Sequence, residues 1–241
     1  MAVLERLFLK LKQRDELAEF EQEALSSAVT EVRDADEGDT LVHAGDQLTT
    51  STILLEGLVG RVRDLSDGRR QIIELHVPGD FFDLHAFLLK KLEHSVEALT
   101  PIKCATVPHD RLKIITERWP HLSRLLWTAT LLDAAIQREK ILSIGRRSAI
   151  SRLAHLLCEL YVRLKVVGLA EDHRYRLDLT QAQLADAAGL TQVHVNRTLK
   201  ELRDRGVVTA RGGTVAIDDW PALIAIAEFT DDYLYLERQP R

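Results

Sequence analysis

Cysteine is scarce in this sequence, with only two among 241 residues. Cys104 and Cys158 stand too far apart to indicate a disulfide framework or a zinc ribbon, and their scarcity fits a reduced, cytoplasmic setting. No run of about 18 apolar residues occurs, so we expect no transmembrane helix and no membrane partner. The first 20 residues mix charged with apolar residues and lack a small-residue cleavage site, so we expect no signal peptide.

The motifs of common enzyme classes are also missing. The sequence contains neither a phosphate-binding loop nor a nucleophile and base at a known spacing. We therefore expect no enzyme, no metal site and no cofactor. With 46% apolar and 29% charged residues, the chain can bury a sizeable core, more readily as two small domains than as one.

The net charge of −5 conceals an uneven distribution of charge along the chain. Residues 146–211 hold twelve Lys and Arg against seven Asp and Glu, whereas the rest of the chain holds 20 against 30. This asymmetry is typical of a chain in which one part meets a polyanion, although a solvated charged surface gives similar counts.

The N-terminal half changes texture near residue 32. Residues 3–30 have the apolar spacing of one or two short helices. Beyond them, short runs rich in β-branched residues alternate with turn signals; the runs are 40–42, 51–55, 58–59, 71–77 and 104–107. Many short strands at this spacing predict an antiparallel, jelly-roll-like β-roll, and the Asp67-Gly68 pair predicts a hairpin within it.

A long helix is predicted after Pro120, with roughly six turns before Gly145. Its apolar residues recur every three or four positions, at Leu122, Leu125, Ala129, Leu132 and Ile136. Such a stripe forms either the core of one chain or a seam between two chains. Because Leu126, Trp127 and Leu131 make the other side apolar too, we expect a dimerisation helix with one face on the roll and the other on a second chain. The positions we assign to the dimer interface are Leu122, Leu125, Ala129, Leu132 and Ile136. We expect residues 143–145 to break it as a hinge.

Residues 177–202 show the pattern of two short helices joined by a tight turn. Thr180 and Gln183 form a capping box for the first helix, and Gly189 suits a turn residue with positive φ. Thr191 can cap the second helix, and strand-like runs flank a glycine turn in residues 207–217. The pattern predicts a winged helix-turn-helix. An ordinary helix pair fits the apolar spacing equally well, but it leaves the turn glycine unexplained.

The second helix of this pair carries the expected DNA contacts. Its apolar stripe turns the other side chains outward, so that Arg197 can pair with guanine, Gln192 or Asn196 with adenine, and Val193 with a thymine methyl group. The side chains expected at phosphates are Thr180, Thr191, Thr198 and Lys200.

A β-roll, a long helix and a winged helix-turn-helix in this order resemble the Crp/Fnr family of bacterial transcription regulators. The most specific matching pieces are Pro78-Gly79-Asp80-Phe81, Gly145-Arg146-Arg147-Ser148-Ala149 with Arg152-Leu153-Ala154, and residues 179–197. The resemblance implies a homodimer joined through the long helix, an inverted-repeat operator, and a roll that alters DNA affinity when it senses a signal. RNA polymerase is a further expected partner if the regulator activates transcription.

The resemblance also indicates an altered effector pocket, formed by Phe82, Asp83, Leu84, His85, His94 and Ser95. Members that bind cyclic AMP carry Gly-Glu-Leu and Arg-Ser where this chain has Asp83-Leu84-His85 and His94-Ser95. Without the ribose acceptor and the guanidinium that pairs with phosphate, we expect no control by cyclic AMP. The effector, if there is one, is unknown.

Other sensing modes find little support in the sequence. The N-terminus lacks the cysteine cluster of iron-sulfur members. Candidate haem ligands by residue type are His76, His85, His94 and Cys104, for which a structural role is the simpler interpretation. Cys158 lies in an apolar helix, where a buried thiol is the ordinary state and a redox switch the alternative.

These patterns together predict an α+β protein. We expect N-terminal helices and a sensor roll in residues 1–118, a dimerisation helix and hinge in 119–145, and a winged helix-turn-helix with a C-terminal helix and tail in 146–241. The expected function is sequence-specific transcription regulation from a palindromic operator. The alternatives are a cyclic-nucleotide-type regulatory subunit or ligand-binding module of an enzyme complex, and a DNA-packaging protein without specificity.

Overall fold

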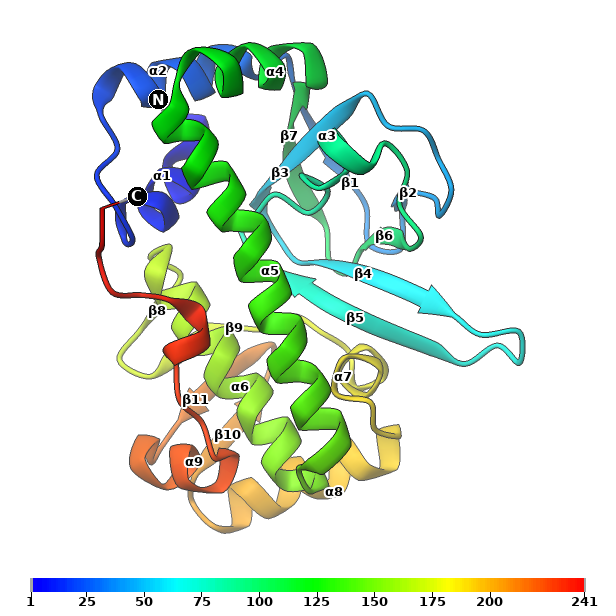
Figure 1. Cartoon of the computed structure of the whole chain (residues 1–241). Coiled ribbons are helices and arrows are strands. Elements are labelled where there is room, and N and C mark those ends of the chain that lie inside the picture. Colours follow the sequence, from blue (N-terminus) through cyan, green and yellow to red (C-terminus); the bar gives the residue numbers. More distant parts are fainter. Residues whose placement is uncertain (1, 241) are drawn as a thin grey trace. The chain divides into compact units, whose positions relative to one another are not determined.

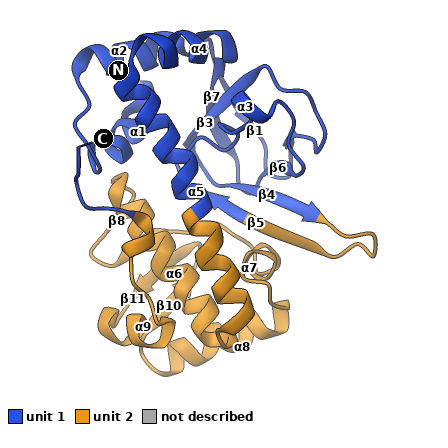
Figure 2. Ribbon diagram, in the orientation of Figure 1, with its two compact units in different colours: residues 1–63, 74–134, 235–241 blue, residues 64–73, 135–234 orange. Residues whose placement is uncertain are grey.

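The structure is a computed structural model that describes residues 2–240. Contacts divide the chain into two compact units (Figure 2), with residues 1–63, 74–134 and 235–241 in unit 1 and residues 64–73 and 135–234 in unit 2. The expected α+β class is confirmed, since helices and antiparallel sheets make up both units. The division into three functional segments stays a prediction, because these units are defined by contacts alone.

Unit 1 contains the N-terminal helices and most of the roll, whose residues 64–73 are assigned to unit 2. Its helical elements are η1 (Ala2–Leu4), α1 (Glu5–Lys12), α2 (Glu19–Ala28), α3 (Ala86–Leu89) and α4 (His109–Arg118). The strands of the roll are β1 (Glu31–Ala35), β2 (Thr40–Val42), β3 (Thr50–Glu56), β4 (Val59–Asp64), β5 (Arg70–His76), β6 (Ser95–Ala98) and β7 (Ile102–Pro108). The sequence patterns missed β1 and β6, because β1 is exposed along most of its length and β6 has only four residues.

The roll consists of two antiparallel sheets, ordered β1-β7-β3 and β2-β6-β4-β5. Alternation along β3 separates its side chains between two apolar cores. Leu54 joins a cluster that includes Val59 of β4 and Val96 of β6 and therefore lies between the sheets. Ile53 and Leu55 join the other cluster, which packs the outer face of the three-stranded sheet against helices.

The turn after β5 depends on a glycine. Gly79 has φ +94°, and a Cβ there would stand 2.8 Å from the carbonyl oxygen of Arg6. Asp80 completes the turn by accepting the Val77 amide hydrogen and pairing with Lys10 of α1 at 2.5 Å. This close approach of the turn to α1 explains why the Pro-Gly-Asp sequence occurs here.

The long helix α5 (Pro120–Arg146) continues through residues 143–145, so the expected break at Gly145 is wrong (Figure 1). A single glycine lowers helix stability by only about 1 kcal/mol, which a 27-residue helix tolerates. The chain leaves the helical conformation at Arg147 and Ser148, and the Ser148 side chain then caps α6 (Ala149–Val166).

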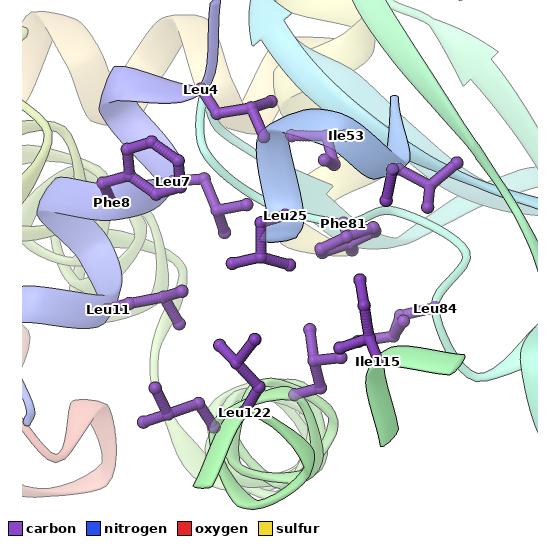
Figure 3. Packing of buried hydrophobic residues seen from close by; sticks show 14 of the residues in the cluster. Leu4, Leu7, Phe8, Leu11, Leu25, Ile53, Phe81, Leu84, Ile115 and Leu122 are labelled. Carbon is purple, nitrogen blue, oxygen red and sulfur yellow. The ribbon is translucent and has the colours of Figure 1, made fainter. Parts of the chain in front are cut away.

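One face of α5 packs into the core of its own chain. Figure 3 shows Leu122 directed toward the side chains of α1 and α2, among them Leu11 and Leu25. The proposed dimer positions Leu122, Leu125, Leu132 and Ile136 are all buried, and Ala129 is partly buried. Their assignment to the dimer seam is corrected, because a side chain already buried within one chain cannot be covered by another.

Unit 2 contains the C-terminal half of the chain. After α6 come β8 (Ala170–Glu171), β9 (Arg174–Arg176), α7 (Gln181–Ala188), α8 (Gln192–Asp204), β10 (Val208–Arg211), β11 (Thr214–Ile217), α9 (Trp220–Ala227) and η2 (Asp232–Leu234). The four strands form one antiparallel sheet in the order β10-β11-β9-β8. The predicted helix pair, glycine turn and final short helix are thus all present.

His121, at the start of α5, provides a pH test of the packing in unit 1. Its ring nitrogens lie 2.7 Å from a Glu21 carboxylate oxygen and 3.2 Å from one of Asp15, and both carboxyl groups are buried. Burial alone would lower the pKa of His121, but hydrogen bonds to Glu21 and Asp15 outweigh it and raise the pKa above 6.5.

We therefore expect wild-type protein to be more stable than the His121→Gln variant below pH 6.5. This advantage should disappear as the pH rises through the raised pKa, because the folded state then loses the proton that the ion pairs favour. Urea unfolding of both proteins across the pH range measures the difference. An advantage that grew with rising pH would contradict the ion-pair assignment.

Candidate functional site

The helix pair α7 and α8 is shaped by its caps. Thr180 accepts the amide hydrogen of Gln183, and the Gln183 side chain accepts that of Thr180 at 2.7 Å, which completes the predicted capping box. Gly189 then adopts φ +63°, so the chain turns sharply after α7. Thr191 accepts the amide hydrogen of His194 and starts α8. Local sequence therefore sets both helix starts and the turn between them.

Arg152 of α6 holds this turn in place. Its guanidinium donates to the carbonyl oxygens of Gly189 at 2.9 Å and Ala188 at 3.4 Å, and to those of Ile144 and Arg147 near the end of α5. Helix ends expose unpaired carbonyl groups, and a cation is the partner they favour. One side chain thus links the ends of α5 and α7 within unit 2.

The outward face of α8 carries the predicted base-reading side chains. Gln192, Asn196 and Arg197 are exposed, and Val193 is 76% exposed, unusual for an apolar residue in a packed helix. Among residues 2–240, no acidic side chain pairs with Arg197, whereas Lys200 pairs with Asp204 at 2.6 Å and Arg205 with Glu201. Arg197 is therefore available to an external hydrogen-bond acceptor.

The four residues expected to contact phosphate differ in their exposure to solvent. Thr198 is only 2% exposed and lies on the inner face of α8 with Val195 and Leu202, so its assignment to phosphate is wrong. The spacing of three and four residues puts it on the apolar stripe. Thr180 and Thr191 are exposed and use their hydroxyl groups in the helix caps, and Lys200 is exposed. Phosphate contact by these three residues stays a prediction.

The strands beside the helix pair form a wing. β10 and β11 pair from Val208 with Ile217 to Arg211 with Thr214. Gly212 and Gly213, with φ +58° and +70°, make the turn between them. Arg211 is exposed next to this turn. An antiparallel wing following two helices is the arrangement of the winged helix-turn-helix.

Comparison with known families gives one match to the roll and one to the helix-turn-helix. Residues 32–118 match the cyclic nucleotide-binding domain, and residues 151–226 match the Crp-like helix-turn-helix domain. The chain belongs to the Crp/Fnr family. This Crp/Fnr protein is a transcriptional regulator with a DNA-binding helix-turn-helix.

Curated relatives and a solved structure show how far the similarity extends. The transcriptional activator protein FnrL of Cereibacter sphaeroides is 27% identical over 214 residues, which cover 87% of this chain and 83% of FnrL. The transcriptional activator protein Anr of Pseudomonas aeruginosa is 23% identical over 86% of this chain and 84% of Anr. The structure of FixK2 from Bradyrhizobium japonicum shares the fold, with a TM-score of 0.75, 24% identity, and coverage of 82% of this chain and 96% of that one.

Within the roll of this Crp/Fnr regulator, the predicted pocket residues divide between two environments. Phe82 and His94 are buried, and the rings of His85 and His94 lie 5.4 Å apart. Leu84 instead joins the outer apolar cluster. Ser95 is half-buried and accepts the amide hydrogen of Ala44.

The carboxylate of Asp83 is hydrogen-bonded to the backbone of β3. It accepts the Thr52 amide hydrogen at 2.5 Å. Burial raises the pKa of Asp83 to about 7, although the bonds from Thr52 and the charge of Arg61 act in the opposite direction.

A buried ion-pair network centred on Arg61 was missed by the sequence reading. Arg61 pairs with Glu74 and, at 2.9 Å, with Asp133; it also donates to the Phe82 carbonyl oxygen at 2.9 Å. Burial disfavours the charge, but Glu74 and Asp133 together raise the pKa of Arg61. The available signal was one charged residue inside each of two strand-like apolar runs, an Arg in 58–62 and a Glu in 71–77.

The remaining candidate sensing residues are buried in the protein. Cys104 and Cys158 are fully buried free thiols, and burial raises the pKa of Cys158 to about 12. His76 is buried beside the carboxylates of Asp80 and Glu74, at 3.6 and 3.9 Å. No helix within residues 2–240 is long and apolar enough to cross a membrane.

Arg197 provides the most direct test of base reading. Replacing Arg197 by Ala should weaken binding to the specific site by about 1–3 kcal/mol and relax discrimination at one guanine, because a bidentate base contact is lost. Lys200→Ala is the matched control on the same helix, and it should weaken binding evenly across sequences. Titration of each variant on specific and random DNA measures both effects. An equal loss on random DNA for Arg197→Ala would assign that residue to phosphate.

Proposed function

We propose that this Crp/Fnr regulator binds an inverted-repeat operator as a homodimer in the cytoplasm, with one α8 helix reading each half-site. The observation that carries this proposal is the outward face of α8, on which Val193 is 76% exposed and Arg197 lacks an acidic partner among the described residues. Arginine can bond guanine at two atoms and valine can pack on a thymine methyl group, so this face suits direct readout.

A second copy of the chain fits the uncovered face of α5. Trp127, Leu131 and Ile141 are 66%, 54% and 70% exposed, and Ala134 and Arg138 lie exposed between them. The spacing of these five positions is four, three, four and three, which is the period of a coiled-coil seam. The seam we propose is therefore this outer stripe in place of the buried one that the sequence suggested.

Exposed leucines of α3 extend the same uncovered region in unit 1. Leu88 and Leu89 are 77% and 63% exposed, and with Trp127 they line a largely apolar groove of about 510 Å³. Single exposed apolar residues are common, but a contiguous apolar patch is typical of an interaction site. Its continuity with the α5 stripe favours the second copy as the partner.

The regulator is proposed to bind DNA without cyclic AMP or an iron-sulfur cluster. In the roll the Arg61 guanidinium is already paired with two carboxylates. Leu84 and His94 also differ from the Glu and Arg that the family resemblance gives for members that bind cyclic AMP. RNA polymerase is a further partner if the regulator activates transcription, as FnrL and Anr are named to do. A role as a subunit of an enzyme complex is less favoured, because the helix-turn-helix would then have no use.

Selection of bound sequences from a random DNA library tests this function directly. Purified protein without added ligand, at near-physiological salt, should enrich a palindrome with half-sites about 10 bp apart. Arg197→Ala protein, shown to be folded, is the control and should lose that motif at one position. If folded, dimeric wild-type protein enriched no sequence, binding without a ligand would be disproved.

Leu131 tests the outer seam of α5. Leu131→Asp should dissociate the homodimer, because it places a charge in an apolar contact, and it should leave the fold intact because the residue is exposed in one chain. Ile114→Asp is the matched control, since Ile114 is also 54% exposed and lies on helix α4. Light scattering of both variants measures the mass. A dimer that survived Leu131→Asp would move the interface elsewhere.

A further inference from the structure

The network around Arg61 joins separate elements of unit 1 at one side chain. Arg61 follows Val59 on the same face of β4, and Val59 lies in the core between the two sheets. Its guanidinium reaches Glu74 on β5, Asp133 on α5 and the carbonyl oxygen of Phe82. One cation therefore holds two strands, the loop after β5 and the long helix together.

The His85 side chain completes the surroundings of the guanidinium. A nitrogen of the Arg61 guanidinium lies 3.3 Å from Nδ1 of His85. Burial and the charge of Arg61 lower the pKa of His85 to about 4, so the ring is neutral and Nδ1 can accept this hydrogen. The Arg61 side chain is 7% exposed and the Glu74 side chain is fully buried. Two of these partners, Phe82 and His85, belong to the set of residues that the family resemblance assigns to an effector pocket, so the guanidinium lies beside that set.

Stability alone is a poor explanation for this network. Withdrawing three charges from water is costly, and an apolar group of similar size commonly stabilises such a site equally well. What an apolar group cannot provide is direction, because the planar guanidinium fixes its acceptors in distance and angle. The contacts of Arg61 are therefore those of a side chain that fixes the positions of the strands and the helix around it.

The element positioned is the long helix α5. Asp133 follows the buried Leu132 and precedes the exposed Ala134, so it stands at the border between the inner and outer faces. A directional bond at this border opposes rotation of the helix about its own axis. Rotation by one residue position would carry Leu131 toward the core and Leu132 outward, since successive residues are about 100° apart. The Arg61–Asp133 pair thus helps to select which face is uncovered.

We propose that Arg61 serves as a built-in ligand of the roll, a positioning residue that fixes α5 from beside the pocket and makes DNA binding independent of an added effector. The proposal rests on the function proposed above, and it also predicts a property of the helix that needs no DNA. The chemical class that could substitute for this side chain is a small planar cation, with guanidinium as the simplest member.

Two variants separate this role from plain structural support. Arg61→Ala leaves the two carboxylates in place and opens a space for a guanidinium ion. The triple variant Arg61→Met, Glu74→Gln, Asp133→Asn removes all three charges while keeping similar volumes, which guards against a chain that merely fails to fold. Arg63→Ala is the matched control, because Arg63 lies two residues farther along β4 and is exposed.

The first readout is binding to the selected operator without added effector. We expect about a tenfold or greater loss for Arg61→Ala and for the triple variant, and none for Arg63→Ala. Guanidinium chloride at about 10 mM, against equal sodium chloride, should restore Arg61→Ala only, because a weak ion needs the intact Glu74 and Asp133 carboxylates. Wild-type binding by the folded triple variant would overturn the proposal.

The second readout is amide hydrogen exchange in residues 127–134 without DNA. Exchange should be faster than wild type in both Arg61 variants, and guanidinium should slow it again in Arg61→Ala alone. Unchanged exchange in the triple variant would overturn the role of Arg61 even if no operator were found. Faster exchange together with wild-type protein that binds no specific DNA would refute the proposed function while retaining the effect on the helix.

Discussion

The packing of one face of α5 into the core of unit 1 is the constraint on which the rest of this regulator depends. Leu122 and Leu125 bury their side chains in the apolar cluster that includes residues of α1 and α2, and this burial leaves almost none of their surface for a second chain. The opposite stripe, from Trp127 to Ile141, is left uncovered as a direct consequence. Hydrophobic burial on one side of the helix therefore decides which face is open to the second copy that we propose.

The DNA-reading unit is organised by backbone groups as much as by apolar contacts. Thr180 and Thr191 satisfy the amides that begin α7 and α8, and Arg152 satisfies carbonyl groups where α5 and α7 end. None of these bonds uses a side chain on the outer side of α8. Arg197 and Val193 can therefore be exposed without loss of the contacts that hold the helix in place.

The roll keeps the architecture of a cyclic nucleotide-binding domain with a different pocket. Beside the residues that the family resemblance assigns to an effector pocket, charged side chains of the chain itself meet at Arg61. Opposite charges that are withdrawn from water must find each other with good geometry, so the pairs join elements far apart in sequence. These side chains come together at that place only when the chain folds.

Local signals in the sequence determined five of the seven strands of the roll, the caps, the turn at Gly189 and the outward side of α8, because each depends on residues within a few positions of one another. They also determined the family. The two faces of α5 could not be told apart, since both carry apolar residues at helical spacing and only the packing of α1 and α2 selects between them. The burial of Thr198 and the ion pairs of Arg61 likewise depend on tertiary packing. Burial and ion pairing over long sequence separations are set by which elements meet, and that is a property of the tertiary structure alone.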